Sequence, residues 1–166
     1  MLLRDAKLGD EVLVVKQLSD REMILGYSRL LAVDIYQKWD TSSPIDYLEI
    51  HTGDEDDDED PLYITPTHSL LIRKQHESVQ EYLFASEAEI DDYLYKTNND
   101  RQSMIEVPIS RINVVKKFDA YAPLTFEGNI VVNNKVASCY GTFSHSTGHL
   151  IKMARRYWLQ FYLSCQ

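Results

Sequence analysis

The residues best suited to chemistry in this chain are a histidine and a cysteine in two separate short motifs. His68 ends the segment Thr65-Pro66-Thr67-His68, which lies between two short apolar runs. A histidine at such a junction is held by backbone on both sides, and near neutral pH it can donate or accept a proton. The residue types alone fit a proton-transfer role and also fit a structural histidine.

The second motif surrounds Cys139. The segment Ala137-Ser138-Cys139-Tyr140-Gly141 has His145 and His149 close behind it. A cysteine near a histidine is typical of nucleophilic catalysis, because the thiolate is the reactive species and an imidazole can generate it. A buried core thiol gives the same pattern, since free cysteine is among the most buried residue types. Composition does not decide between these two interpretations.

Short runs rich in β-branched and aromatic residues predict strands on both sides of each motif. They span residues 12–16, 23–34, 47–51, 62–65, 70–73 and 107–117, and residues 130–136 are expected to form a strand, an Asn-rich turn and a second strand. Gly-, Asn-, Asp- and Ser-rich turn signals separate these runs. Many short strands at this spacing predict an all-β domain.

One internal similarity stands out among the strands. Residues 8–13, Leu-Gly-Asp-Glu-Val-Leu, resemble residues 90–95, Ile-Asp-Asp-Tyr-Leu-Tyr, because in both a small or acidic turn leads into a strand. Duplication of a β-unit would produce this similarity, and so would chance.

The C-terminus is the segment with a clear helical pattern. Its apolar residues recur at helical spacing, and most of its basic residues fall elsewhere on the helix. The apolar set is Leu150, Ala154, Tyr157, Trp158, Phe161 and Tyr162. This stripe must be covered, either by packing on the sheet or by serving as a surface for a lipid or a partner.

The composition of the 166 residues fits one globular domain, and the net charge of −9 argues against nucleic acid as a partner. Part of that charge is the run at residues 54–60, which is best interpreted as a solvated hairpin loop because it lacks the Gly-containing pattern of an EF-hand. Two cysteines are too few for a disulfide scaffold. Neither a signal peptide nor a transmembrane segment is expected, and no metal site is expected.

Several segments, in one order, carry a resemblance to a known family. They are residues 8–13, Gly26-Tyr27-Ser28, residues 47–52, residues 62–68 with the Thr-x-x-His motif, Tyr121-Ala122-Pro123-Leu124-Thr125, residues 128–133 and Ala137-Ser138-Cys139-Tyr140. Together they resemble the Hedgehog-type Hint (hedgehog/intein) domain, the autoprocessing module of Hedgehog and of warthog- and groundhog-like proteins. Thr-x-x-His alone is a weak signal, but the ordered set ending in Ala-Ser-Cys-Tyr is specific and runs through nearly the whole chain.

The resemblance implies a fold and a division of the chain. The fold is the all-β Hint fold, a disc of strands with pseudo-two-fold symmetry, with a short C-terminal helix. Residues 1–145 are expected to form the Hint domain without its first strand and its cysteine nucleophile. Residues 146–166 are expected to form a helical, aromatic extension that corresponds to a reduced lipid-recognition region.

The family reaction begins at a cysteine that opens the domain. Its thiol attacks the preceding carbonyl in an N–S acyl shift, and a second nucleophile, a sterol hydroxyl in Hedgehog proteins, then takes the acyl group and releases the upstream fragment. By resemblance, His68 protonates the leaving nitrogen, Thr65 orients the scissile peptide and Cys139 supports thioester formation or exchange.

By the same resemblance, Asp34 is the carboxylate that activates the sterol hydroxyl. It lies one residue nearer to Tyr27 than the family spacing, so a surface carboxylate at a strand end is the alternative. His145 and His149 match family positions after one deletion and are interpreted as structural.

The chain departs from the family at its beginning. Residue 1 is methionine and no cysteine precedes Gly9, so the chain as written is not expected to cleave itself by the family route. Two hypotheses remain: an autoprocessing domain that is competent once the cysteine-initiated strand is supplied, or a non-catalytic binding or folding module. The resemblance further implies a covalently linked upstream signalling domain, the secretory pathway, a monomer, no cofactor, and a sterol as candidate co-substrate.

Overall fold

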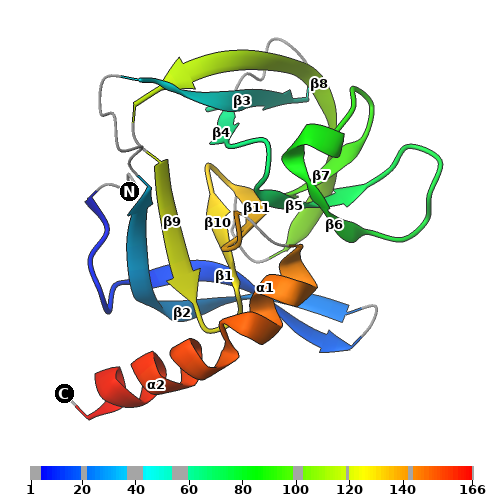
Figure 1. Cartoon of the computed structure of the whole chain (residues 1–166). Helices are drawn as coiled ribbons and strands as arrows, with labels where there is room; N and C mark the ends of the chain where they lie inside the picture. The colour runs from blue at the N-terminus through cyan, green and yellow to red at the C-terminus, as the bar shows by residue number, and fades with distance from the viewer. Residues whose placement is uncertain are drawn as a thin grey trace.

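The computed structural model describes residues 5–19, 22–36, 43–53, 60–98, 103–118, 120–141 and 144–165, and strands predominate among them (Figure 1). The strands are β1 (Glu11–Ser19), β2 (Glu22–Tyr36), β3 (Ile45–Thr52), β4 (Leu62–Ile64), β5 (Ser69–Arg73), β6 (Glu81–Phe84), β7 (Tyr93–Thr97), β8 (Met104–Lys117), β9 (Ala120–Thr125), β10 (Asn129–Val132) and β11 (Lys135–Ser138). A 3₁₀ turn (Ala85–Glu87) follows β6, and the helices α1 (His145–Ile151) and α2 (Met153–Ser164) end the chain. The predicted all-β class with a short helical C-terminus is confirmed.

The strands form two sheets. One has three strands in the order β1-β2-β9, and the other has eight in the order β10-β11-β5-β7-β8-β3-β4, with β6 paired to β5. In both sheets one long strand serves two partners: β2 pairs first with β1 and then with β9, and β8 pairs first with β7 and then with β3. The similar segments at residues 8–13 and 90–95 each lead into the strand that precedes this long strand. The structure therefore shows the pseudo-two-fold arrangement.

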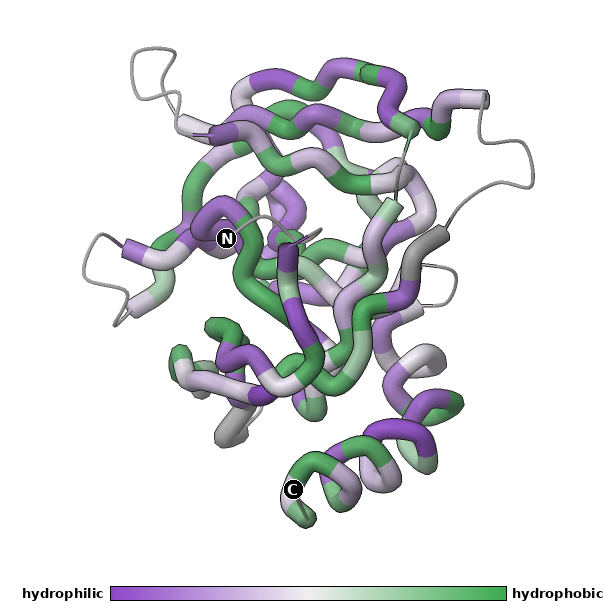
Figure 2. The backbone as a smooth tube through the Cα atoms, turned by 90° about the vertical axis from the view of Figure 1, so that its left-hand side faces the viewer, coloured by the Kyte–Doolittle hydropathy of each residue, from purple (hydrophilic) through white to green (hydrophobic). Residues whose placement is uncertain are grey.

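The core is divided among the faces of these sheets. Green, apolar residues alternate with purple, polar ones along most strands in Figure 2, as expected where one face of a sheet is buried. One buried cluster lies under β3, β4, β5 and β7, and a second joins β1, β2 and β9 to Cys139 and Tyr140. Cys139 thus belongs to the core that the β1-β2-β9 sheet covers.

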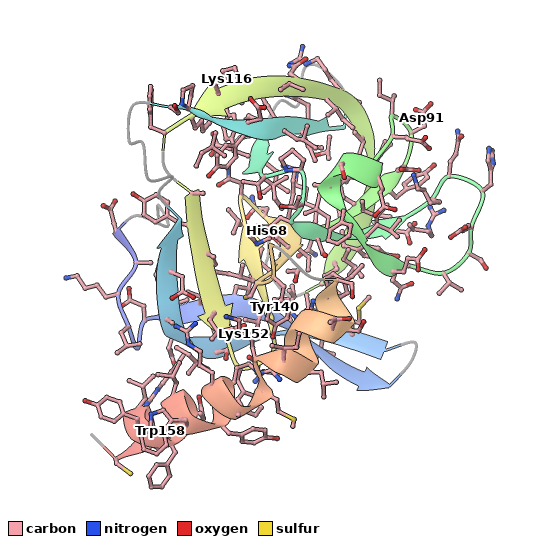
Figure 3. The ribbon with its side chains drawn as sticks, viewed as in Figure 1. His68, Asp91, Lys116, Tyr140, Lys152 and Trp158 are labelled. Carbon is pink, nitrogen blue, oxygen red and sulfur yellow. The ribbon has the colours of Figure 1, made fainter. Side chains whose placement is uncertain are left out.

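Of the two alternatives for the C-terminal apolar stripe, packing on the sheet is wrong. Trp158 is 68% exposed and Phe161 is 65% exposed, and Figure 3 labels Trp158 on α2, near the C-terminal end of the chain. The face that packs on the second cluster instead presents Leu159 and Leu163, and beside them Arg156 is buried. A guanidinium is buried here because it bonds to Tyr140 and His149.

Two further sequence predictions concern the acidic run and membrane-spanning segments. Of the acidic run, residues 54–59 lie outside the described residues, and Asp60 accepts a hydrogen bond from Lys135 through its backbone carbonyl. In the described part of the chain, neither α1 nor α2 has the length and apolar character that a membrane crossing requires.

Candidate functional site

Thr65 and His68 lie at the two ends of the tight turn that links β4 to β5. The turn is closed by a hydrogen bond of 3.0 Å from the His68 amide to the Thr65 carbonyl. On the side-chain level, Thr65 Oγ1 lies 3.4 Å from His68 Nδ1. The spacing of the Thr-x-x-His motif therefore places a hydroxyl and an imidazole next to each other without help from distant parts of the chain.

The antiparallel pairing of β5 with β11 brings the Cys139 motif beside this turn. Leu70 is the partner of Ala137, and the Ser69 amide bonds to the Tyr140 carbonyl at 3.3 Å. The ring of His68 lies against Gly141, where an added Cβ would come within 2.7 Å of His68 Nδ1. Only glycine at residue 141 leaves room for the imidazole in this position.

The environment of His68 sets its charge. Burial lowers the pKa of His68 to about 4, and a hydrogen bond with the Ser138 backbone opposes that effect without overcoming it. The imidazole is therefore neutral at pH 7. In that state, it can take a proton from one group and pass it to another.

Cys139 lies just beyond β11, with its thiol buried and not in the cavity that His68 lines. Its Sγ atom is 3.6 Å from Thr125 Oγ1. The Thr125 hydroxyl donates its proton to the Asn129 carbonyl at 2.7 Å, so the thiol is the donor in the contact with Thr125. Burial raises the pKa of Cys139 to about 11, which keeps the group a thiol at neutral pH.

Asp34 lies on β2 and is bound by the C-terminal helix. Arg155 on α2 donates two hydrogen bonds to its carboxylate, at 2.8 Å and 2.9 Å. The hydrogen bonds and charge of Arg155 lower the pKa of Asp34 although partial burial opposes them. Asp34 therefore stays ionised at neutral pH, and its backbone pairs with Ala122 of β9, which lines the same cavity as His68.

This cavity of about 420 Å³ lies in front of Thr65 and His68. Its apolar walls come largely from three strands, which supply Leu62–Ile64 of β4, Ala120–Pro123 of β9, and Ile130 and Val132 of β10. In the described part of the chain these three are the outermost strands of their sheets. An outer strand offers unpaired backbone groups, so this groove is suited to an extended polypeptide.

The two C-terminal histidines lie on α1, and neither lines the groove. His145 stacks on Tyr82 with ring centroids 3.7 Å apart, and burial lowers its pKa to about 4. His149 Nδ1 lies 3.2 Å from the Tyr140 hydroxyl and is also bonded to Arg156. Both rings connect α1 to the segment that carries Cys139.

Four residues around the site were not predicted from the sequence to have a role. Thr125, Ser138 and Gly141 lie inside motifs that the sequence singled out, but nothing in those motifs shows which side chain or ring each one contacts. Arg155 had no signal at all, since it is separated from Asp34 by 121 positions in the chain.

Known proteins resemble this chain in sequence. A sequence model described as the Hint module matches residues 2–161. Protein hedgehog of Drosophila persimilis is 31% identical over 104 residues, which cover 62% of this chain and 21% of that protein. Warthog protein 6 of Caenorhabditis elegans is 25% identical over 144 residues, or 86% of this chain and 22% of that protein. The chain thus spans about a fifth of the length of these relatives.

Solved structures resemble it in fold. The crystal structure of a DnaB intein from Synechocystis matches with a TM-score of 0.63 and 11% identity, covering 83% of this chain and 85% of the intein. The solution structure of a bacterial intein-like domain from Clostridium thermocellum matches with a TM-score of 0.59 and 13% identity, covering 82% and 86% of the two chains. At these identities, the likeness establishes the fold alone.

Proposed function

Because this chain belongs to the Hint module family, we propose that it is the autoprocessing domain of a Hedgehog-like precursor, which cleaves the peptide bond in front of it and transfers the upstream fragment to a nucleophile. The observation that carries the proposal is the Thr65–His68 pair, which lines an apolar groove between three outer strands. A hydroxyl can orient a peptide bond by hydrogen bonding, and a neutral imidazole beside it can transfer the proton that the departing nitrogen needs.

The groove receives the segment that carries the scissile bond. In the precursor this segment opens with the cysteine nucleophile and lies extended between β4, β9 and β10, with apolar side chains against Leu62, Ile130 and Val132. Backbone pairing with the strand edges supplies register, and the apolar walls supply affinity. Thr65 then hydrogen-bonds the scissile peptide and fixes its orientation.

The first chemical step is the N–S acyl shift. The cysteine thiol adds to the carbonyl carbon of the preceding residue, the C–N bond breaks, and a C–S bond remains. His68 is neutral at pH 7, so it takes the thiol proton and delivers it to the departing nitrogen. A role for Cys139 in thioester exchange requires its buried thiol to leave Thr125, reach the cavity and ionise.

The second step transfers the acyl group to an acceptor, for which we propose a sterol hydroxyl. The acceptor oxygen adds to the thioester carbonyl, the cysteine sulfur leaves, and the hydroxyl proton goes to Asp34, which Arg155 keeps ionised. The exposed aromatic side chains of α2, among them Tyr157 and Trp158, are the candidate contact for the lipid. This reaction belongs to a secreted signalling precursor.

A fusion protein tests the cleavage. A reporter domain ending in glycine is joined through a Cys-initiated strand to Met1, and cleavage is followed with and without dithiothreitol. We expect thiol-induced release, a loss of at least about a hundredfold in rate for His68→Ala, and a smaller loss for Thr65→Ala. His76→Ala is the matched control, since its side chain is exposed and does not line the cavity.

The outcomes separate the candidate functions. No cleavage by the folded fusion protein would support a non-catalytic binding or folding module instead. Cleavage with no label on the released fragment after addition of a labelled sterol would leave autoprocessing intact and exclude the sterol as acceptor. Loss of label in Asp34→Asn, with thiol-induced cleavage retained, would support the role of Asp34 in the second step.

A further inference from the structure

His145 is held in a fixed orientation from two sides. Its ring stacks on Tyr82 with an interplanar angle of 8°, and its Nδ1 atom lies 3.0 Å from the Ser138 hydroxyl. The proposed reaction assigns no role to this buried histidine. Its contact with Ser138 is the link to the reacting groups.

Ser138 connects His145 to His68. Its hydroxyl accepts a hydrogen bond of 3.0 Å from the Tyr140 amide, so the hydroxyl proton and one lone pair remain for His145. Ser138 and His68 line the same cavity, and the Ser138 backbone raises the pKa of the His68 ring against the effect of burial. One residue is therefore fixed by His145 through its side chain and bonded to His68 through its main chain.

The fit around His68 makes this connection sensitive to small displacements. Ser138 is the last residue of β11, and two backbone hydrogen bonds hold the residues after it, from the Cys139 amide to the Gly128 carbonyl at 2.8 Å and from the Ser69 amide to the Tyr140 carbonyl at 3.3 Å. Gly141, three residues later, lies in contact with the His68 ring. A shift of the segment between them changes both the hydrogen bond to the imidazole and the surface against which it packs.

We propose that His145 is a positioning residue for His68: it fixes Ser138 so that the Ser138 carbonyl selects one tautomer of the His68 imidazole. The nitrogen that bonds to Ser138 keeps its hydrogen, and the other nitrogen presents a lone pair. The inference rests on the proposed function, because a fixed tautomer matters when His68 moves a proton.

Nitrogen NMR of the chain as it stands tests this without any cleavage. The ring ¹⁵N shifts of His68 should report one dominant tautomer in the wild type, and His145→Ala should move both shifts toward the average of the two tautomers. His145→Asn should retain the wild-type shifts, since its amide can replace Nδ1. His149→Gln is the matched control: it changes the other histidine of α1, which bonds to Tyr140 and Arg156, and should leave the His68 shifts unchanged.

Ser138→Ala keeps the test open if His145→Ala fails to fold, because it removes the same hydrogen bond without changing α1. Wild-type His68 shifts in folded Ser138→Ala or His145→Ala would overturn the proposal. In the fusion protein, His145→Ala should slow cleavage on the order of tenfold and His149→Gln much less. A wild-type fusion protein that does not cleave would refute the proposed function, whereas the NMR result would still decide whether His145 positions His68.

Discussion

The turns that lead into β1 and β7 have the same hydrogen bonds and different sequences. In the first, the Gly9 amide donates to Leu30 at 2.8 Å, and the Leu30 amide donates back to Asp10 at 2.8 Å. In the second, the Asp91 amide donates to Ile109 at 2.9 Å, and the Ile109 amide donates back to Asp92 at 2.8 Å. Each turn therefore fixes the middle of its long strand, β2 or β8, in the same way.

The carboxylates of the two turns show where the resemblance ends. Asp10 accepts a hydrogen bond from the Lys7 amide, and Asp92 accepts the equivalent bond from the Glu89 amide, both at 2.8 Å. Asp92 is also buried and binds the Lys74 ammonium at 2.9 Å. The same backbone hydrogen bonds thus support the fold at both turns. Only the second turn adds an ion pair, between the buried Asp92 carboxylate and the partly buried Lys74 ammonium.

The repeated pattern consists of two units, one built on the long strand β2 and the other on the long strand β8. The groove and the Thr65–His68 pair lie between these units and are not repeated. The walls of the groove combine β9, which pairs with β2 of the first unit, with β4, which pairs with β3 of the second. Scaffold and site are therefore separable: the turns should control stability, and the residues between the units should control chemistry.

Removing the carboxylate of the second turn should have the largest effect on stability. Asp92→Ala removes a buried carboxylate that accepts hydrogen bonds from the Glu89 and Gln75 amides and from the Lys74 ammonium, and Lys74 keeps only the Glu89 carboxylate and the Glu87 carbonyl. We expect a loss of about 4 kcal/mol in the free energy of unfolding. Urea denaturation followed by far-UV circular dichroism measures it. A loss below about 1 kcal/mol would show that Asp92 contributes no more than an ordinary turn carboxylate.

The second-largest effect on stability should come from acid, through protonation of His68 and His145. Burial lowers the pKa of His68 and of His145 to about 4 from the usual 6.5, so between those values the unfolded chain binds more protons than the folded one. The free energy of unfolding should therefore fall as the pH drops from 6.5 to 4, by about 3 kcal/mol for His68.

The same denaturation carried out across this pH window tests the prediction. His68→Gln should make the curve flatter, because it removes one of the histidine rings whose pKa the fold lowers. Glu49 provides a separate window: hydrogen bonds from Asn113 and Tyr63 lower its pKa to about 2, so its contribution is lost below the usual 4.5. Stability that stays constant from pH 7 to 4.5 would contradict the burial of neutral histidines.

How much of this could be predicted from the sequence depends on the distance between partners. The Thr65–His68 pair and the β10–β11 hairpin are local, and Asn133 and Asn134 both adopt the positive φ that a two-residue hairpin turn requires. The exposed face of α2 could not be predicted, because periodicity shows that a helix has an apolar face but not which face packs. That choice depends on Arg156 meeting Tyr140, 16 residues away.

The carboxylate of the first turn should matter less than that of the second. Asp10→Ala removes the acceptor of the Lys7 amide, and both groups are accessible enough for water to replace the bond in part. We expect a loss of about 1 kcal/mol by the same denaturation. A loss equal to that of Asp92→Ala would remove the distinction between the two turns and show that hydrogen bonding of the backbone, not the Lys74 pair, sets the contribution.

The smallest effect should come from exchanging the residues that take a positive φ in the two turns. Gly9 has φ of +90°, and Asp91 has φ of +70°. Gly9→Asp puts a side chain where no atom lies within 4 Å of its Cβ, so it adds only left-handed strain, offset in part by a less flexible unfolded chain. Each exchange, Gly9→Asp and Asp91→Gly, should change stability by less than about 1 kcal/mol in urea denaturation, because the strain and the entropy change partly cancel. If Gly9→Asp cost more than about 2 kcal/mol, glycine would be required there for a reason other than its φ angle, and the two turns would not be equivalent.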